Sequence, residues 1–226
     1  MNPVPERIVL ENGFCTIRIW FSKIGRARFI SHLDLNRTMI RALRRAEIPL
    51  WYTEGFNRHP YVTFAAPLSL GYEGERECMD IRLVEDLAPD VLVQRLDAVM
   101  PEGLSILEAA PAVMKPGALT AAQYRMIFDC SPEMLEAFLR QESIPVEKRT
   151  KKKGVTKTVE LKPYLADVHP TAAENGCELL PTLPCSSEES INPGLIAEAL
   201  GRFAGQAVPL RVRRLALYGK DGRLFA

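Results

Sequence analysis

The sequence lacks the short motifs that would assign a reaction to it. It has no phosphate-binding loop, no dinucleotide fingerprint, no cysteine pairs at zinc-site spacing and no nucleophile elbow. No apolar run approaches membrane-spanning length, and the first residues show no apolar signal region, so we expect no membrane partner. Function therefore has to be sought in local surfaces.

An excess of charge of either sign is also missing. The formal net charge of the 226 residues is +1, which does not describe a globally basic nucleic-acid protein, so any such role needs local basic patches. The cysteines are odd in number and widely spread, which is typical of reduced thiols in the cytoplasm. We expect no metal and no cofactor from this scattered set, which comprises Cys15, Cys78, Cys130, Cys177 and Cys185.

The first half of the chain predicts the order strand, helix, strand, strand, helix, strand. Period-2 alternation marks the strands, and apolar residues at helical spacing mark the helices. Either Ser31 or Asp34 can cap the first helix, which Pro49 closes. The expected elements are strands at 15–21 and 26–30, a helix after Ser31, extended segments at 50–53 and 61–66, a strand at 77–84, a helix at 90–100 and a strand at 104–110.

A proline-rich linker at 111–119 separates this half from a second one with similar patterning. The second half predicts strands at 124–129, 145–150, 156–161, 178–183 and 210–218, with helices from Ser131 to Arg140 and from Pro193 to Ala204. The last strand carries a basic face of Arg211, Arg213 and Arg214. We therefore predict an α+β fold of two tandem ferredoxin-like (split βαβ, RRM-like) units with antiparallel sheets. The expected division is a leader at 1–13, domains at 14–110 and 120–220, and the linker at 111–119.

Arginines gather on one side of the first predicted helix. Leu35, Met39 and Leu43 share its apolar face, and the opposite face carries only arginine as its basic residue. The planar guanidinium suits phosphate and carboxylate, so this pattern favours an anion-binding face. Solvated arginines, or salt bridges to another element, remain the alternative. The arginines in and around the helix are Arg26, Arg28, Arg37, Arg41, Arg44, Arg45 and Arg58.

Two histidines and a lysine run complete the candidate residues. Phe56, Asn57, Arg58 and His59 share one turn, a combination that single-stranded RNA contacts use through stacking and base-edge hydrogen bonds. His32 lies at a strand-to-helix corner, where a structural role, an RNA contact and general acid–base catalysis are all open. The loop of Lys151, Lys152 and Lys153 is either a solvated hairpin tip or a second backbone contact.

The segments ISHLDLNRTMIRALRRAEIPL and EGFNRHPYVTFAAPLSLGYEGERECMDI resemble the DUF2344 family, the bacterial radical SAM-associated proteins. The resemblance covers about residues 17–218, although Arg58 replaces the proline of the family's GFNPHP turn. It implies a radical SAM enzyme as partner, in a separate chain, because this chain has no CxxxCxxC. The two tandem units also look similar to CRISPR RNA-processing endoribonucleases, a likeness of architecture only.

We therefore expect a cytoplasmic accessory protein that binds RNA, either tRNA or rRNA, and presents it to a separate radical SAM enzyme. Two alternatives stay open. One is a metal-independent endoribonuclease that uses His32 or His59, and the other is a protein-only scaffold for the radical SAM partner. The expected RNA contacts are Arg26, Arg28, His32, Arg37, Arg41, Arg44, Phe56, Asn57, Arg58, His59 and Lys151 to Lys153.

Overall fold

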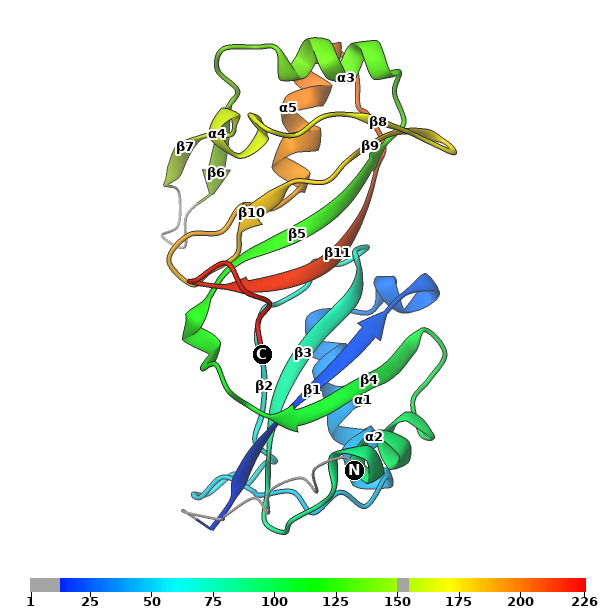
Figure 1. Cartoon of the computed structure of the whole chain (residues 1–226), viewed down its shortest axis with the longest axis vertical. Helices are drawn as coiled ribbons and strands as arrows, with labels where there is room; N and C mark the ends of the chain where they lie inside the picture. The colour runs from blue at the N-terminus through cyan, green and yellow to red at the C-terminus, as the bar shows by residue number, and fades with distance from the viewer. Residues whose placement is uncertain (1–12, 150–154) are drawn as a thin grey trace, which may run out of the picture.

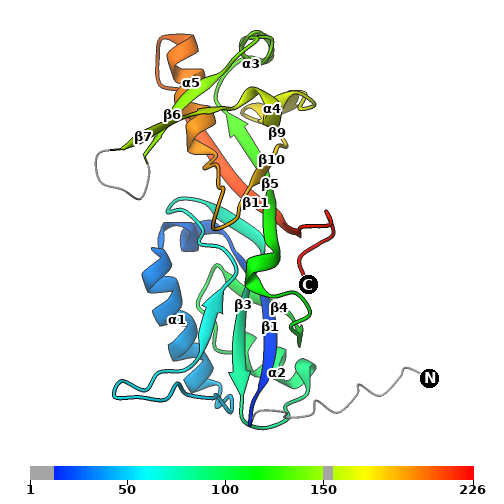
Figure 2. The same ribbon diagram turned by 90° about the vertical axis from the view of Figure 1, so that its left-hand side faces the viewer.

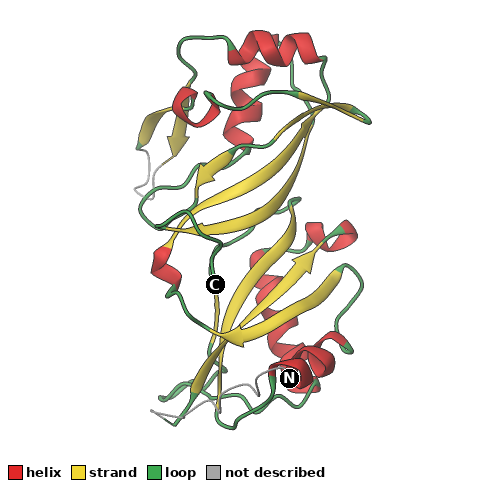
Figure 3. Ribbon diagram, in the orientation of Figure 1, coloured by secondary structure: helices red, strands yellow, loops and turns green. Residues whose placement is uncertain are grey.

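The computed structural model describes residues 13–149 and 155–226 of the chain. The protein is a mixed α+β structure in which two halves are stacked along its long axis (Figures 1 and 3). A nine-stranded, mostly antiparallel sheet runs through both halves in the order β4-β1-β3-β11-β5-β9-β8, with β2 added to β3 and β10 to β5. The described residues also form five α-helices and a separate two-stranded sheet.

The first half keeps the predicted alternation of strands and helices. Its elements are β1 (Cys15–Lys23), the 3-10 helix η1 (Gly25–Phe29), α1 (His32–Arg45), β2 (Val62–Phe64), β3 (Glu73–Leu83), α2 (Pro89–Asp97) and β4 (Leu104–Pro111). Strand β3 pairs with β1 and β2, and β1 pairs with β4, all antiparallel. Cys15, Ile17, Ile19 and Phe21 of β1 are buried in one core with the apolar faces of α1 and α2, as the alternation predicts.

The strand predicted at 26–30 is wrong, because this segment forms η1. Gly25 has a φ of +59°, a left-handed conformation that turns the chain out of the sheet directly after β1. Short-range hydrogen bonds from Ala27 N to Ile24 O and from Ile30 N to Ala27 O then close the 3-10 turns. The turn leads into α1 and leaves Arg26 exposed on its surface.

The second half contains more short strands than the first. Its elements are η2 (Pro116–Ala118), β5 (Leu119–Phe128), α3 (Pro132–Leu139), β6 (Pro145–Arg149), β7 (Thr156–Glu160), α4 (Lys162–Leu165), β8 (Thr171–Ala173), β9 (Gly176–Leu179), β10 (Thr182–Pro184), α5 (Gly194–Ala204) and β11 (Leu210–Gly219). Strands β6 and β7 form the predicted hairpin outside the main sheet. Tyr124, Met126 and Phe128 of β5 pack in one core with α3 and α5. Trp20, Ala66 and Cys78 of the first half join this core, so it extends across the boundary between the halves.

The two halves meet where β3 lies beside β11, a boundary we call the seam. These strands pair in parallel at only two positions, Arg213 with Glu73 and Arg214 with Gly74. Arg213 forms ion pairs with Glu73 at 2.7 Å and with Glu75 at 3.1 Å, while Arg214 pairs with Glu77. The side chains of Arg214 and Glu77 are only 2% and 4% exposed.

The predicted basic face of the last strand is therefore wrong for Arg213 and Arg214. Adjacent residues of a strand point to opposite faces, so these two arginines cannot share one. The three glutamates of β3 hold both arginines at the seam. Arg211 is the member of the predicted set that stays exposed and has no ion-pair partner among the described residues.

A buried ion pair also joins β1 to β3, on the face of the sheet that points away from the first core. Arg18 donates to both oxygens of Asp80, at 2.7 and 2.9 Å, and to the carbonyl oxygen of Met114. Its guanidinium also lies 4.1 Å from the centre of the Phe225 ring. Helices long and apolar enough to cross a membrane do not occur in the part of the chain that is described.

The seam ion pair generates a stability prediction. Glu77→Ala should lower the free energy of unfolding by about 3–5 kcal/mol, because it leaves the buried Arg214 charge without its partner. The double variant Glu77→Met/Arg214→Met should recover most of this loss, since it removes both charges. Urea denaturation followed by circular dichroism measures each value.

The matched control is Glu136→Ala, which breaks the exposed Glu136–Arg140 pair within α3 and its C-cap. An exposed i,i+4 pair contributes about 0.3–0.5 kcal/mol, so this variant should unfold almost like the wild type. Equal losses for Glu77→Ala and Glu136→Ala would show that the seam pair does not carry the predicted energy.

Candidate nucleic-acid interface

Helix α1 separates its apolar and basic faces as its sequence predicts. Ser31 caps it, because the Ser31 hydroxyl accepts a hydrogen bond from Asp34 N at 3.1 Å. The helix ends at Arg45, and Glu47 has a left-handed φ of +53° just beyond it. The buried residues of the helix are Leu35, Met39, Ala42 and Leu43, and the exposed basic ones are Arg37, Arg41, Arg44 and Arg45.

Most of these arginines lack a strong internal partner. Arg37 lies 3.4 Å from Asp34 in an exposed pair, and Arg45 donates to the carbonyl oxygen of Val99. Arg44 lies over the ring of Tyr52 at 5.9 Å. Arg41 has no ion-pair or hydrogen-bond partner among the described residues, and the same is true of Arg26 and Arg58. Salt bridges therefore do not account for this face, in contrast to the arginines of the seam.

Arg28 belongs to the predicted set but lies at the border of the seam. Its guanidinium is 3.7 Å from Glu73 and 4.7 Å from the centre of the Phe29 ring. The side chain is 38% exposed, so it is less available to a ligand than Arg41.

The loop at 53–60 presents an aromatic side chain to solvent. Thr53 N donates to His59 O at 2.9 Å and His59 N donates to the Thr53 hydroxyl at 3.3 Å, which closes the loop at its neck. The imidazole Nδ1 of His59 lies 3.0 Å from the carbonyl oxygen of Asn57. Phe56 is fully exposed at the tip, and Asn57 and Arg58 are exposed beside it. Because the loop is closed at its base and its phenyl ring is exposed, the ring is suited to stacking against another planar group.

The base of this loop is held by an aromatic cluster that the sequence did not reveal. The guanidinium of Arg82 lies 4.0 Å from the ring centres of Phe14 and Tyr61 and 5.0 Å from that of Trp51. Trp51 N donates to Arg82 O, and Tyr61 N donates to Trp51 O. The loop therefore leaves and returns to the sheet through packed residues, and its tip projects from a fixed base.

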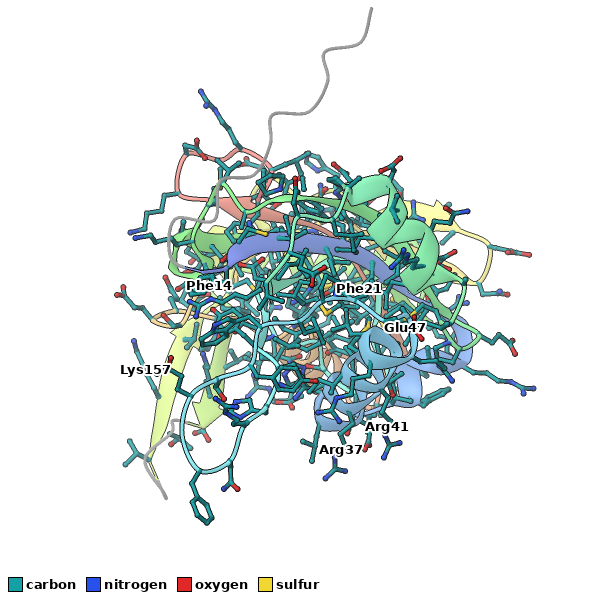
Figure 4. All side chains as sticks on the ribbon, turned by 90° about the horizontal axis from the view of Figure 1, so that it is seen from below. Phe14, Phe21, Arg37, Arg41, Glu47 and Lys157 are labelled. Atoms are coloured by element: carbon teal, nitrogen blue, oxygen red, sulfur yellow. The ribbon has the colours of Figure 1, made fainter. Side chains whose placement is uncertain are left out.

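The arginine helix and the loop lie on one side of the molecule. Figure 4 shows Arg37 and Arg41 projecting from the outer surface of α1, on the side that also carries the loop and the β6–β7 hairpin with Lys157. Figure 2 shows α1, the loop and the hairpin on the same side. Lys151, Lys152 and Lys153 lie outside the described residues. We call α1 and the 53–60 loop, with Arg26, the basic face.

Acidic residues on the basic face are fewer than arginines. Asp34 pairs with Arg37, and Glu47 and Glu54 are exposed without an ion pair in the described part of the chain. Positive charge therefore remains in excess over the surface that runs from Arg26 to Arg58. Such a surface attracts phosphates, and it does so without a globally basic chain.

His32 is the first residue of α1 and packs edge-on against Phe64, with ring centres 5.1 Å apart. Burial and the nearby positive charge of Lys23 lower the pKa of His32 below its ordinary value. The ring is therefore neutral at pH 7 and offers a hydrogen bond or a stacking surface in place of a charge.

Neither candidate histidine has a carboxylate partner among the described residues. No carboxylate contacts the ring of His32 or His59 in residues 13–149 and 155–226, and His59 is already bonded within its own loop. Those ranges also contain no group of three or more His, Cys, Asp or Glu side chains that could bind a metal.

Comparison with protein-family models places the chain in a family. A family model described as an uncharacterized protein conserved in bacteria (DUF2344) matches residues 16–193, which run from the second residue of β1 to the residue before α5 and include the whole basic face. A search of curated proteins found no match.

The environment of His32 predicts its titration. In the folded protein its pKa should lie below the ordinary value of 6.5, measured by NMR as the pH dependence of the imidazole signals. Lys23→Met should move the value upward, because it removes a neighbouring positive charge. Since the unfolded chain binds this proton more readily, His32 should also make the protein less stable as the pH falls below 6.5. A native pKa above 6.5 would contradict the effects assigned to partial desolvation and to the Lys23 charge.

Proposed function

The chain belongs to the DUF2344 family, and on this premise we propose that it binds RNA through the basic face and presents it to a radical SAM enzyme in a separate chain. The observation that carries the RNA part is the set of exposed arginines without acidic partners, beside a loop with a fully exposed phenyl ring. The radical SAM partner rests on the family resemblance of the sequence. The RNA would be tRNA or rRNA.

Unpaired nucleotides fit this surface better than a regular duplex. Sequence-tolerant binding of single strands combines cationic side chains that follow the backbone with aromatic rings on which bases stack. Arg41 and Arg58 supply the first, and Phe56 supplies the second on a loop whose base is fixed by Arg82 and its aromatic neighbours. Asn57 beside the ring adds an amide for a base edge.

The same proposal extends to the architecture and the location. The pairing orders β4-β1-β3-β2 and β11-β5-β9-β8 support two divergent ferredoxin-like units, the second enlarged by the β6–β7 hairpin, with α1 and α3 following the first strand of each. We place the protein in the cytoplasm, where its scattered thiols would stay reduced.

Two experiments separate this proposal from its alternatives. Incubation of labelled RNA with the protein in EDTA should leave the RNA intact, whereas a histidine-dependent endoribonuclease would cleave it. A pull-down of the radical SAM partner before and after nuclease treatment tests the scaffold alternative. Loss of the partner after nuclease supports RNA presentation, and unchanged capture favours direct protein docking on the arginines.

Substitution of one unpaired arginine should weaken RNA binding measurably. Arg41→Ala removes one phosphate contact, so the slope of log Kobs against log salt concentration should flatten by about one unit. Stability should change by no more than about 0.5 kcal/mol, because the side chain is exposed. Fluorescence anisotropy with a labelled single-stranded RNA at several salt concentrations measures the slope.

The control is Arg95→Ala, which removes an exposed arginine of α2 that lacks a partner among the described residues. It changes the net charge equally but does not lie on the basic face, so its salt slope should match the wild type. Equal slopes for both variants, or no RNA binding by the wild type at low salt, would rule out the assigned surface.

The exposed phenyl ring predicts selectivity for unpaired nucleotides. Phe56→Ala should weaken single-stranded RNA binding by about 1–3 kcal/mol, the range for one lost base stack, and should affect a blunt duplex much less. Phe56→Trp should retain binding, and base stacking should quench its added indole fluorescence. If Phe56→Ala weakens both RNAs equally, the ring does not read unpaired bases.

A further inference from the structure

A cavity of about 460 Å³ lies at the seam, away from the basic face. It is lined by the 65–72 segment of the first half, by Pro116 and Tyr124, and by the 184–193 segment of the second half. Its size falls within the range of small-molecule sites, which often form between domains. Most of its wall is apolar, with Leu68, Pro184 and Ile191 among its surfaces.

The cavity has one charged side chain in its wall, Arg214. Glu77 accepts from Nε and Nη2 of this guanidinium, and Ala66 O also accepts from Nη2 at 3.0 Å. The contacts of Nη1 are longer, 3.3 Å to Pro67 O and 3.8 Å to Cys185 Sγ, and the Tyr124 side chain also interacts with this guanidinium. This nitrogen is thus the least satisfied donor of the buried guanidinium, and two of its neighbours, Pro67 and Cys185, also line the cavity.

Positive charge remains after the ion pair is formed. Lys23 is 1% exposed and donates to two carbonyl oxygens, Arg28 O at 3.2 Å and Tyr72 O at 3.4 Å, so no carboxylate is bonded to it. Burial lowers the pKa of Lys23. The negative charge of Glu77 raises this pKa and the positive charge of Arg214 lowers it, so the three charges interact with one another. Lys23, Arg214 and Glu77 together leave one buried positive charge close to the cavity.

The acidic side chains near the cavity do not line it, so they do not neutralise this positive charge there. The 185–190 segment carries Glu188 and Glu189, but neither lines the cavity. Glu189 instead accepts a hydrogen bond from the Tyr164 hydroxyl at 2.9 Å. Apart from Arg214, the polar side chains that line it are neutral, including the hydroxyls of Ser186, Ser187 and Ser190.

We propose that the seam cavity binds a small organic monoanion, a carboxylate with an apolar body. The single buried positive charge matches one carboxylate, which would accept from Nη1 of Arg214, whereas a phosphate dianion would bring more charge than the site balances. The apolar wall accommodates the body of the ligand. This proposal does not rest on RNA binding by the basic face.

An occupied cavity would join the two halves. The Tyr72 hydroxyl donates to Asn192 Oδ1 at 2.8 Å, and Asn192 Nδ2 donates to Ser69 Oγ at 3.0 Å, so both halves already meet through residues of the cavity wall. A ligand in contact with Leu68 and Ile191 adds a second connection. Binding should therefore stabilise the folded protein in proportion to the logarithm of ligand concentration.

The test uses 2-naphthoate as the probe and the neutral 2-naphthamide as its matched control. Naphthoate at millimolar concentration should raise the thermal midpoint and bind with one-to-one stoichiometry in calorimetry, and naphthamide should bind at least tenfold more weakly. Cys185 supplies a local readout because it lines the cavity. In a Cys130→Ser background, naphthoate should slow alkylation of Cys185 by monobromobimane.

Two variants make the result specific to the cavity. Lys23→Met removes the excess charge and should bring naphthoate affinity down to that of naphthamide. Cys185→Phe fills the cavity and should abolish binding of both, which keeps the test decisive if Lys23→Met fails to fold. Equal affinity for both probes, or no binding and no protection of Cys185 by naphthoate, would overturn the proposal.

Discussion

The buried ion pair between Arg214 and Glu77 is the constraint on which the joining of the two halves depends. Burial alone would lower the pKa of Arg214, but the Glu77 carboxylate raises it above its ordinary value, so the guanidinium stays charged inside the protein. Strands β3 and β11 share only two residue pairs, too few for backbone hydrogen bonds to fix their register. A side chain at Gly74 would overlap the Glu77 carboxylate, so the glycine makes room for the pair. Such pairs specify an arrangement more than they stabilise it, and here they align one half against the other.

Arginine has two separate roles in this chain, and burial distinguishes them. Arg18, Arg213 and Arg214 have carboxylate partners on β3, and the two most buried of them also donate to backbone carbonyls. Arg41 and Arg58 are exposed and have no such partners in the described ranges. An internal cation that lost its partner would destabilise the fold, whereas an exposed one is free to exchange its counterions for phosphates. The unpaired arginines are thus the ones available for recognition.

Much of the first half could be predicted from the sequence because its signals are local. The Ser31 cap and the two faces of α1 follow from helical spacing, and the exposed turn follows from Gly55 and its polar neighbours. The seam could not be predicted in this way. Arg214 lies in a strand whose register shifts between Arg214 and Ala216, and its partner lies 137 residues away, so its nearness to Arg211 and Arg213 in the sequence assigned it to a basic outer face. The cluster around Arg82 was missed for the same reason, since Phe14, Trp51 and Tyr61 come from three separate segments.

One lysine connects the two surfaces that we assign to ligands. Lys23 donates to Tyr72 O, whose side chain lines the seam cavity, and to Arg28 O in the turn that leads into α1. Gly71 N donates to the same Arg28 oxygen, so the cavity wall and the start of the basic face are held by shared hydrogen bonds. A buried ammonium with only carbonyl partners is costly to desolvate, and it persists where it fixes several segments at once. The charge that we propose attracts an anion to the cavity is thus the same charge that fixes the approach to α1, and the position of the basic face depends on the seam.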